Sequence, residues 1–123
     1  MTRINCVPVQ ELTDAHLGAE YRELPRVFKL AEAAYRRGDD WRTYPQEYVL
    51  GPGHVKFFYP RLRYLQSRFI RIVEECHRRG RKAFYTDTPA VSVSSAWWQD
   101  WEPTPEALAL NRARIAERLS PKR

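Results

Sequence analysis

The segment from Arg22 to Lys29 combines basic side chains with a carboxylate at helical spacing. Arg22, Arg26 and Lys29 are separated by four and three residues, so on a helix their side chains share one face. Glu23 lies at the edge of this basic face, where the guanidinium groups should keep it ionised. Two interpretations stay open from spacing alone. The basic face either follows a phosphate backbone or is simply solvated, and Glu23 is either an acid/base group or a surface ion-pair partner.

A candidate nucleophile lies at the N-terminus. Thr2 follows the initiator Met, and a small residue in this position usually permits removal of Met and leaves a free α-amine. An α-amine has an ordinary pKa near 8, against about 10.4 for lysine, so far more of it is unprotonated at pH 7. Arg3 and the basic face would lower the pKa of this amine further. Most N-terminal amines have no catalytic role, and the position alone does not assign one.

The three histidines show no spacing typical of a metal site or of a Ser-His-Asp triad. His16 falls in the first turn of a predicted helix, two turns before Glu23, so it could line the same site. His77 is expected to interact with the C-terminal dipole of a second helix. We therefore expect no metal centre.

The composition favours an anionic partner. There are 21 Lys and Arg residues against 15 Asp and Glu, which gives a net charge of +6 and a pI near 9.6. Nucleic acid and an acidic membrane surface both fit this charge. The chain has no apolar run long enough to cross a membrane and no secretion signal at its N-terminus, so we expect a soluble intracellular protein. Cys6 and Cys76 lack metal-ligand spacing and are expected to be reduced core residues.

Apolar periodicity predicts an all-α fold, with one domain over residues 1–123. Three main helices are joined by long irregular loops, and Pro25 should bend the first helix. Gly38 and Gly80 are expected to end the first two helices. The predicted helices span 14–37, 60–79 and 105–119. The irregular segments span 39–59, which could include an extra turn of helix, and 81–102.

The third helix has a clear beginning, because Thr104 can cap it and Pro105 fits its first turn. We expect this helix to bury Leu108, Ile115 and Leu119. Three tryptophans precede it, and they either stack on bases or pack in or over the core. They are Trp97, Trp98 and Trp101.

Longer stretches of the sequence resemble the endonuclease V family of T-even phages, which are pyrimidine-dimer DNA glycosylases. The resemblance is carried by MTRIN at the start, by AEYRELPRVF ending at Phe28, and by LGPGHVKFFY from Leu50 to Tyr59. It continues through EECHRRG, which ends at Gly80, and more weakly through TPEALA into the third helix.

This resemblance implies an all-helical enzyme without metal or cofactor that couples a glycosylase to an abasic-site lyase. By the resemblance, the α-amine of Thr2 is the nucleophile that forms an imine with C1′ of the damaged nucleotide, and Glu23 assists β-elimination. The remaining implied site residues contact DNA or lie beside the active site. They are Arg3, His16, Arg22, Arg26, Arg114 and Arg118.

We therefore expect a DNA-repair enzyme that acts on ultraviolet-induced cyclobutane pyrimidine dimers. Its partner would be double-stranded DNA containing pyrimidine dimers or abasic sites, and we expect a monomer without membrane contact. Its location would be the cytoplasm of a bacterial or phage-infected cell. Two alternatives stay open: a basic helical DNA-binding protein without catalysis, and an abasic-site lyase without dimer preference.

Overall fold

The computed structural model describes residues 4–119, and the regular secondary structure of this range is helical apart from one isolated bridge between Arg61 and Trp98. Its α-helices are α1 (Asp14–Arg36), α2 (His54–Phe58), α3 (Leu62–Arg78) and α4 (Pro105–Leu119). Short 3-10 helices are η1 (Val9–Glu11), η2 (Trp41–Thr43) and η3 (Ser95–Trp97). The predicted all-α fold class is confirmed. Within the same range, no helix is both long and apolar enough to span a membrane.

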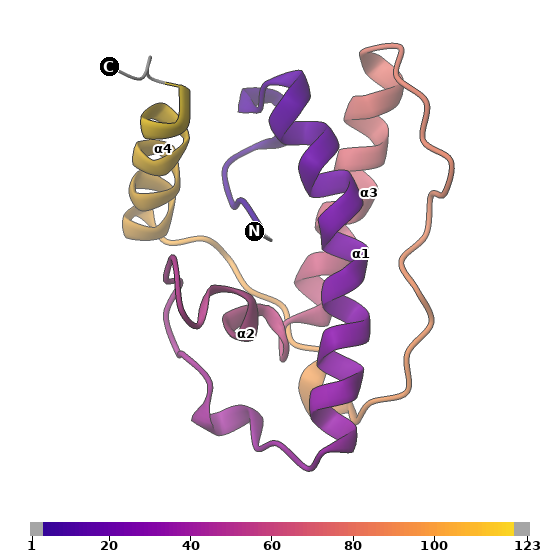
Figure 1. Ribbon diagram of the computed structural model, residues 1–123, viewed down its shortest axis with the longest axis vertical. Coiled ribbons are helices and arrows are strands. Elements are labelled where there is room, and N and C mark those ends of the chain that lie inside the picture. The colour runs from indigo at the N-terminus through magenta and orange to yellow at the C-terminus, as the bar shows by residue number, and fades with distance from the viewer. Residues whose placement is uncertain (1–3, 120–123) are drawn as a thin grey trace.

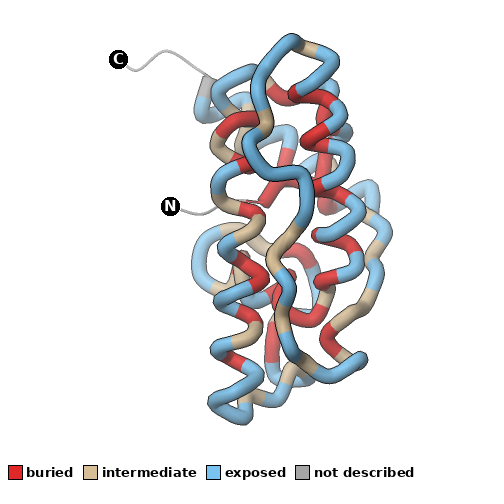
Figure 2. The backbone as a smooth tube through the Cα atoms, turned by 90° about the vertical axis from the view of Figure 1, so that its right-hand side faces the viewer, coloured by how far each residue is buried: buried red, intermediate tan, exposed pale blue. Residues whose placement is uncertain are grey.

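The two longest helices form the centre of the molecule. α1 and α3 lie side by side, and α4 stands on the far side of the N-terminal segment (Figure 1). The segment that follows α3 returns along the helix pair as an extended chain (Figures 1 and 2). The N-terminal segment therefore passes between the helices rather than around them.

α1 begins at the predicted residue and ends one residue before the predicted end at 37. The Thr13 hydroxyl accepts a hydrogen bond from the His16 amide at 3.2 Å, which satisfies one of the free amides of the first turn. After Arg36 the chain reaches Gly38, whose φ of 85° suits glycine and ends the helix. The helix continues through Pro25, which lies inside it.

α3 begins two residues later than the predicted start at Pro60. The reason is tertiary: the Pro60 carbonyl accepts a hydrogen bond from the Gln99 amide at 3.1 Å, and Arg61 forms the isolated bridge with Trp98. Pro60 therefore lies outside the helix, and Arg61 is its N-cap residue, with φ −122° and ψ 44°. The predicted stop at Gly80 is confirmed, with a φ of 75°.

One hydrophobic core joins these elements. Both cysteines are buried and free, as predicted. Trp97 is buried, and Trp98 and Trp101 pack against the core, which confirms the core interpretation of this group. Tyr35, near the end of α1, is 39% exposed and meets Trp97 edge-on. The largest fully buried apolar side chains are Phe28, Phe57, Phe58, Phe69, Ile4, Leu17, Leu24, Leu62, Leu65, Ile72 and Val7.

α4 starts where the sequence predicts, and the Thr104 hydroxyl accepts a hydrogen bond from the Ala107 amide at 3.0 Å. The prediction that Leu119 is buried concerns a side chain that lies outside the described part of the structure. Leu108 and Ile115 are half-buried, and the fully buried position of this face is Asn111. The last turns of α4 border an open cavity, which Arg114, Ile115 and Arg118 line.

Candidate active site at the N-terminal segment

Residues 4–7 are clamped by side chains from four different elements. Ile4 and Val7 are fully buried, and Asn5 and Cys6 nearly so. A buried backbone amide or carbonyl without a partner is costly, so a buried irregular segment needs hydrogen bonds from elsewhere. The surrounding helices provide them through polar side chains at positions that face the core.

A buried ion pair between α1 and α3 holds one side of this segment. Glu20 and Arg68 are hydrogen-bonded to each other, and neither is more than 6% exposed. Arg68 also donates to the Val7 carbonyl at 2.8 Å, and the Asn5 amide group donates to Glu20 at 2.9 Å. Burial disfavours the charged form of Arg68, but the adjacent Glu20 carboxylate outweighs this and raises its pKa.

The other side of the segment is held by α4 and by the region around α2. The Asn111 side-chain oxygen accepts hydrogen bonds from the amides of Cys6 at 2.8 Å and Val7 at 3.1 Å. His54 Nε2 accepts from the Ile4 amide at 2.8 Å, and its Nδ1 lies 2.8 Å from a backbone carbonyl, which places the ring proton on Nδ1. The chain that leads to the N-terminus therefore has a fixed path.

Removal of one partner of the buried Glu20–Arg68 ion pair should strongly lower the stability of the protein. In Arg68→Met, the Glu20 carboxylate stays buried without its cation and the Val7 carbonyl loses its donor. We expect the free energy of unfolding to fall by about 3–5 kcal/mol. Urea denaturation at pH 7, followed by circular dichroism, measures this change.

Arg112→Met is the matched control for this prediction. Arg112 also joins two distant elements, because it pairs with Glu11 at 2.8 Å, but both of these side chains are at least 40% exposed. Removing an exposed pair should cost about 0–1 kcal/mol. Equal losses of stability in the two variants would show that burial of the Glu20–Arg68 pair has no special weight.

A cavity of about 190 Å³ lies between α1, α4 and the clamped segment. Glu23 and His16 line it from α1, where they lie two turns apart on one face. Arg114 and Arg118 line it from α4, and Asn5 closes it from the N-terminal segment. The structure therefore brings together four of the predicted site residues from two helices that are far apart in the sequence.

The cavity holds one carboxylate among several cations. Glu23 has a side chain that is 26% exposed, and its Oε1 lies 3.6 Å from Arg26 Nη1. Arg114 lies 3.7 Å from Glu117, with a side chain that is 28% exposed. The Nδ1 atom of His16 is buried and has no hydrogen-bond partner within residues 4–119. The site can thus attract an anion while it offers a carboxylate and an imidazole nitrogen.

The other predicted site residues fall in two groups. Arg22 lies on the exposed face of α1, outside the lining of the cavity, and its guanidinium passes over Gly18. Thr2 and Arg3, the proposed nucleophile and its basic neighbour, lie outside the described residues. Lys29, the third member of the basic face, lies 3.9 Å from Glu32.

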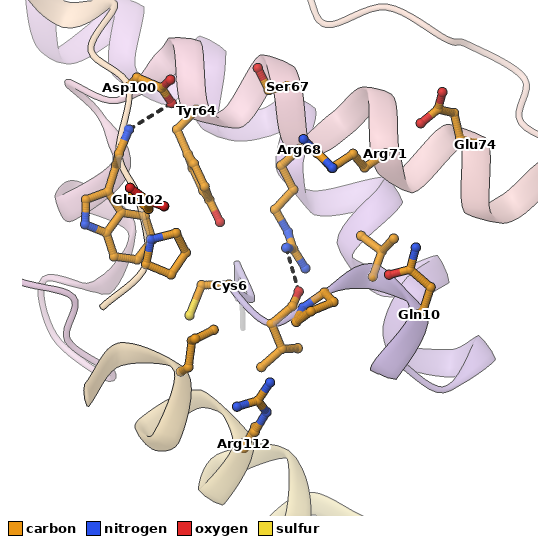
Figure 3. Close-up of a pocket in the computed structure, with 16 residues that line it drawn as sticks. Cys6, Gln10, Tyr64, Ser67, Arg68, Arg71, Glu74, Asp100, Glu102 and Arg112 are labelled. Carbon is orange, nitrogen blue, oxygen red and sulfur yellow. Dashed lines mark hydrogen bonds between the residues drawn. The ribbon is translucent and has the colours of Figure 1, made fainter. Parts of the chain in front are cut away.

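A larger hollow of about 900 Å³ borders the N-terminal segment at Cys6, Val7 and Pro8, and its lining includes none of the predicted site residues. Figure 3 shows that Cys6 and Arg68 point into it, and Arg68 there meets the Val7 carbonyl. Burial raises the pKa of Cys6 to about 11, so this thiol is protonated at neutral pH. Cys6 is therefore a poor nucleophile, although it lies close to the N-terminus.

The residues that hold the N-terminal segment were not predicted from the sequence. Glu20 and Arg68 lie at core-facing positions between Leu17 and Leu24 and between Leu65 and Ile72. Charged residues of opposite sign on the apolar faces of two helices are the signal that could have revealed them, because buried charges are nearly always paired. Nothing in the sequence indicated Asn111, since an isolated Asn on a helix is usually exposed.

The chain was compared with models of known protein families. The family model described as pyrimidine dimer DNA glycosylase matches residues 1–91 of the 123-residue chain. The matched range contains α1, α2 and α3, including Glu23 and His16, and ends before α4.

Proposed function

Because the chain belongs to the pyrimidine dimer DNA glycosylase family, we propose that it both excises dimers and cuts the DNA strand, with the Thr2 α-amine as nucleophile. Membership of the family makes DNA with pyrimidine dimers the substrate. The proposal adds three points: the dimers are the cyclobutane type formed by ultraviolet light, the enzyme is also an abasic-site lyase, and Glu23 is its essential carboxylate.

The observation that carries this mechanism is the convergence of the clamped N-terminal segment and Glu23 on one cavity. Asn5 lines the same cavity as Glu23, and Ile4 is held by hydrogen bonds to both its amide and its carbonyl. Covalent geometry keeps the Cα of Thr2 within about 7 Å of the Cα of Ile4. An amine tethered so closely acts at a high effective concentration on any substrate that binds beside Glu23.

In the first chemical step, the Thr2 nitrogen attacks C1′ and the glycosidic C–N bond breaks. The base leaves with the bonding electron pair and takes up a proton. The C1′–O4′ bond then breaks with its electron pair on O4′, and the sugar ring opens. The amine nitrogen loses two protons in all, which balance the one taken up by the base and the one taken up by O4′, and the product is an imine between this nitrogen and C1′. The Glu23 carboxylate would stabilise the positive charge that develops on the sugar during this step.

In the second step, the imine makes the C2′ proton acidic. Glu23 assists removal of this proton, the electron pair forms the C2′–C3′ double bond, and the C3′–O bond breaks with phosphate as the leaving group. Water then hydrolyses the imine and regenerates the amine. His16, whose Nδ1 faces no protein partner within the described residues, would supply a further polar contact in the cavity.

The arginines would bind phosphates on both sides of the damaged nucleotide. Arg114 and Arg118 flank the cavity on α4, and Arg26 and Arg22 extend along the exposed side of α1. Arg3 would add a contact next to the nucleophile. Phosphate contacts of this kind release counterions, so binding should weaken steeply as salt concentration rises.

Borohydride trapping tests the proposed function directly. The protein is incubated with duplexes that are undamaged, contain a cyclobutane dimer, or contain an abasic site, and sodium borohydride then reduces any imine to a stable covalent adduct. We expect adducts with the dimer and abasic duplexes and none with undamaged DNA, also in the presence of EDTA. Mass spectrometry of the adduct should locate the link at the N-terminal residue.

The remaining outcomes identify the alternatives. An adduct with the abasic duplex alone would indicate a lyase without dimer preference. Binding to DNA without any adduct would indicate a helical DNA-binding protein that lacks catalysis. An adduct that maps to a lysine would overturn the role of Thr2.

A further inference from the structure

The segment that follows α3 presents an aromatic ring to solvent. Phe84 is 86% exposed, and it follows the basic residues Arg81 and Lys82. The segment runs along the helix pair for most of its length, as Figure 2 shows. An exposed aromatic ring does not gain the favourable free energy of burial. The contacts of the neighbouring residues show whether such a ring belongs to a loose loop or to a binding surface.

The neighbouring residue anchors Phe84 to the body of the protein. The Tyr85 ring stacks on Tyr21 of α1, with centroids 4.8 Å apart, and also on Phe69 of α3. The Tyr21 hydroxyl donates to the Tyr85 carbonyl at 2.9 Å and lies 3.0 Å from the Tyr85 amide. Both polar groups of the Tyr85 backbone are thus bound to one residue of α1, and the exposed ring of Phe84 is held next to this anchor.

The start of the same segment brings a second cation to α1. A Cβ atom at Gly18 would lie 3.3 Å from Arg81 Nη2 and 3.5 Å from Arg22 Nη1, so the two guanidinium groups converge over this glycine. Asp14 holds Arg81 from the other side, with 3.8 Å between its Oδ2 and Arg81 Nη1. Two adjacent guanidinium groups are a favourable site for a phosphate, which can accept hydrogen bonds from both.

These features continue the basic side of the proposed active site around α1. At about 100° per residue, the helix surface leads from Glu23 in the cavity through Arg26 and Arg22 to Gly18, where Arg81 begins. Arg26, Arg22 and Arg81 supply three cations along this path, and Glu23 and Asp14 are carboxylates beside its two ends. The cavity lies at one end of the path, and Phe84 lies beyond the other. A DNA strand is the partner that needs both cations for its phosphates and an aromatic surface for its bases.

We propose that Arg81 and Phe84 form a second DNA-contacting surface, in which Arg81 with Arg22 binds a backbone phosphate and Phe84 stacks on an unstacked base. This inference rests on the proposed function, because it assumes that damaged DNA crosses α1. The contact lies apart from the residues that take part in the chemistry. It therefore sets how tightly a damaged duplex is held and leaves the imine step unchanged.

Binding measurements separate this surface from the catalytic site. The probe is a labelled duplex with a tetrahydrofuran abasic analogue, which has no C1′ hydroxyl and cannot form an imine. Phe84→Ala should weaken binding about tenfold, which corresponds to about 1.4 kcal/mol, and Phe84→Trp should restore it. Arg81→Gln should weaken binding several-fold and reduce the dependence of log K on log salt by about one, whereas Phe84→Ala should leave that slope unchanged.

Ile70→Ala is the control, because Ile70 is an apolar residue on α3 that is 52% exposed and lies outside the proposed surface. The affinity of Ile70→Ala for the tetrahydrofuran duplex should equal that of the protein without substitutions. Trapping on a true abasic duplex at saturating protein should be the same in all these variants.

The outcomes keep the two proposals distinct. If the unchanged protein forms adducts but Phe84→Ala and Arg81→Gln bind the duplex normally, this second surface is refuted while the proposed function stands. If the unchanged protein neither binds damaged duplexes nor forms adducts, both fail. If Phe84→Ala alters sedimentation of the free protein rather than DNA affinity, the ring belongs to a contact between two copies of the chain, and the DNA surface is refuted.

Discussion

Blocking the N-terminal amine is expected to abolish imine trapping and strand cleavage, with a loss of at least about a thousandfold. An acetylated nitrogen has its lone pair delocalised into the carbonyl group and cannot attack C1′. Retention of Met1 moves the amine one residue further along the chain, about 3.8 Å between Cα atoms. Since the clamp on residues 4–7 fixes where this chain emerges, the displaced amine would no longer meet the sugar beside Glu23.

Preparations with a free, an acetylated and a Met-extended N-terminus, each verified by mass spectrometry, allow this comparison. Rates of nicking of irradiated plasmid and yields of borohydride adduct are measured for each. Thr2→Ala is the matched control, because it keeps a free amine after Met removal and loses only the hydroxyl, and it should stay active. All three preparations should bind the tetrahydrofuran duplex. Normal nicking by an acetylated preparation would disprove the mechanism.

Replacement of Glu23 by Gln should lower strand cleavage by about 10²–10⁴ while binding to damaged DNA is retained. The amide has nearly the shape of the carboxylate but neither its negative charge nor its ability to accept the C2′ proton. Loss of the contact with Arg26 at 3.6 Å should cost little stability, because the Arg26 side chain is 71% exposed. Single-turnover cleavage of an abasic duplex and gel-shift binding, measured on the same preparation, give the two quantities.

Glu32→Gln provides the control for Glu23→Gln. Glu32 is a carboxylate on the same helix, it also lies near basic side chains, and it accepts a hydrogen bond from the Ser92 amide, which Gln can still receive. It lies nine residues from Glu23, which places it on the opposite side of α1. Cleavage by Glu32→Gln should be normal. If Glu23→Gln cleaves as fast as Glu32→Gln, the essential carboxylate must be sought elsewhere.

Local signals in the sequence predicted the helices well. The Thr13 and Thr104 caps, Gly38 and Gly80 all act within a few residues of the helix ends that they define. The prediction of a helix boundary failed where contacts between residues far apart in the sequence determine it. Because the Pro60 carbonyl accepts a hydrogen bond from the Gln99 amide and Arg61 forms a bridge with Trp98, α3 begins two residues later than predicted.

The sequence by itself determined the helical fold and, through its resemblance to a repair family, indicated Glu23 and its basic neighbours as a candidate site. Only the tertiary structure placed Glu23 and His16 opposite Arg114 and Arg118 across one cavity, and only it revealed the clamp made by Glu20, Arg68 and Asn111. The physical reason is the range of the interactions. Helix periodicity and capping depend on residues three or four positions apart, whereas buried polar groups find partners up to about a hundred residues away, at distances that only packing can set.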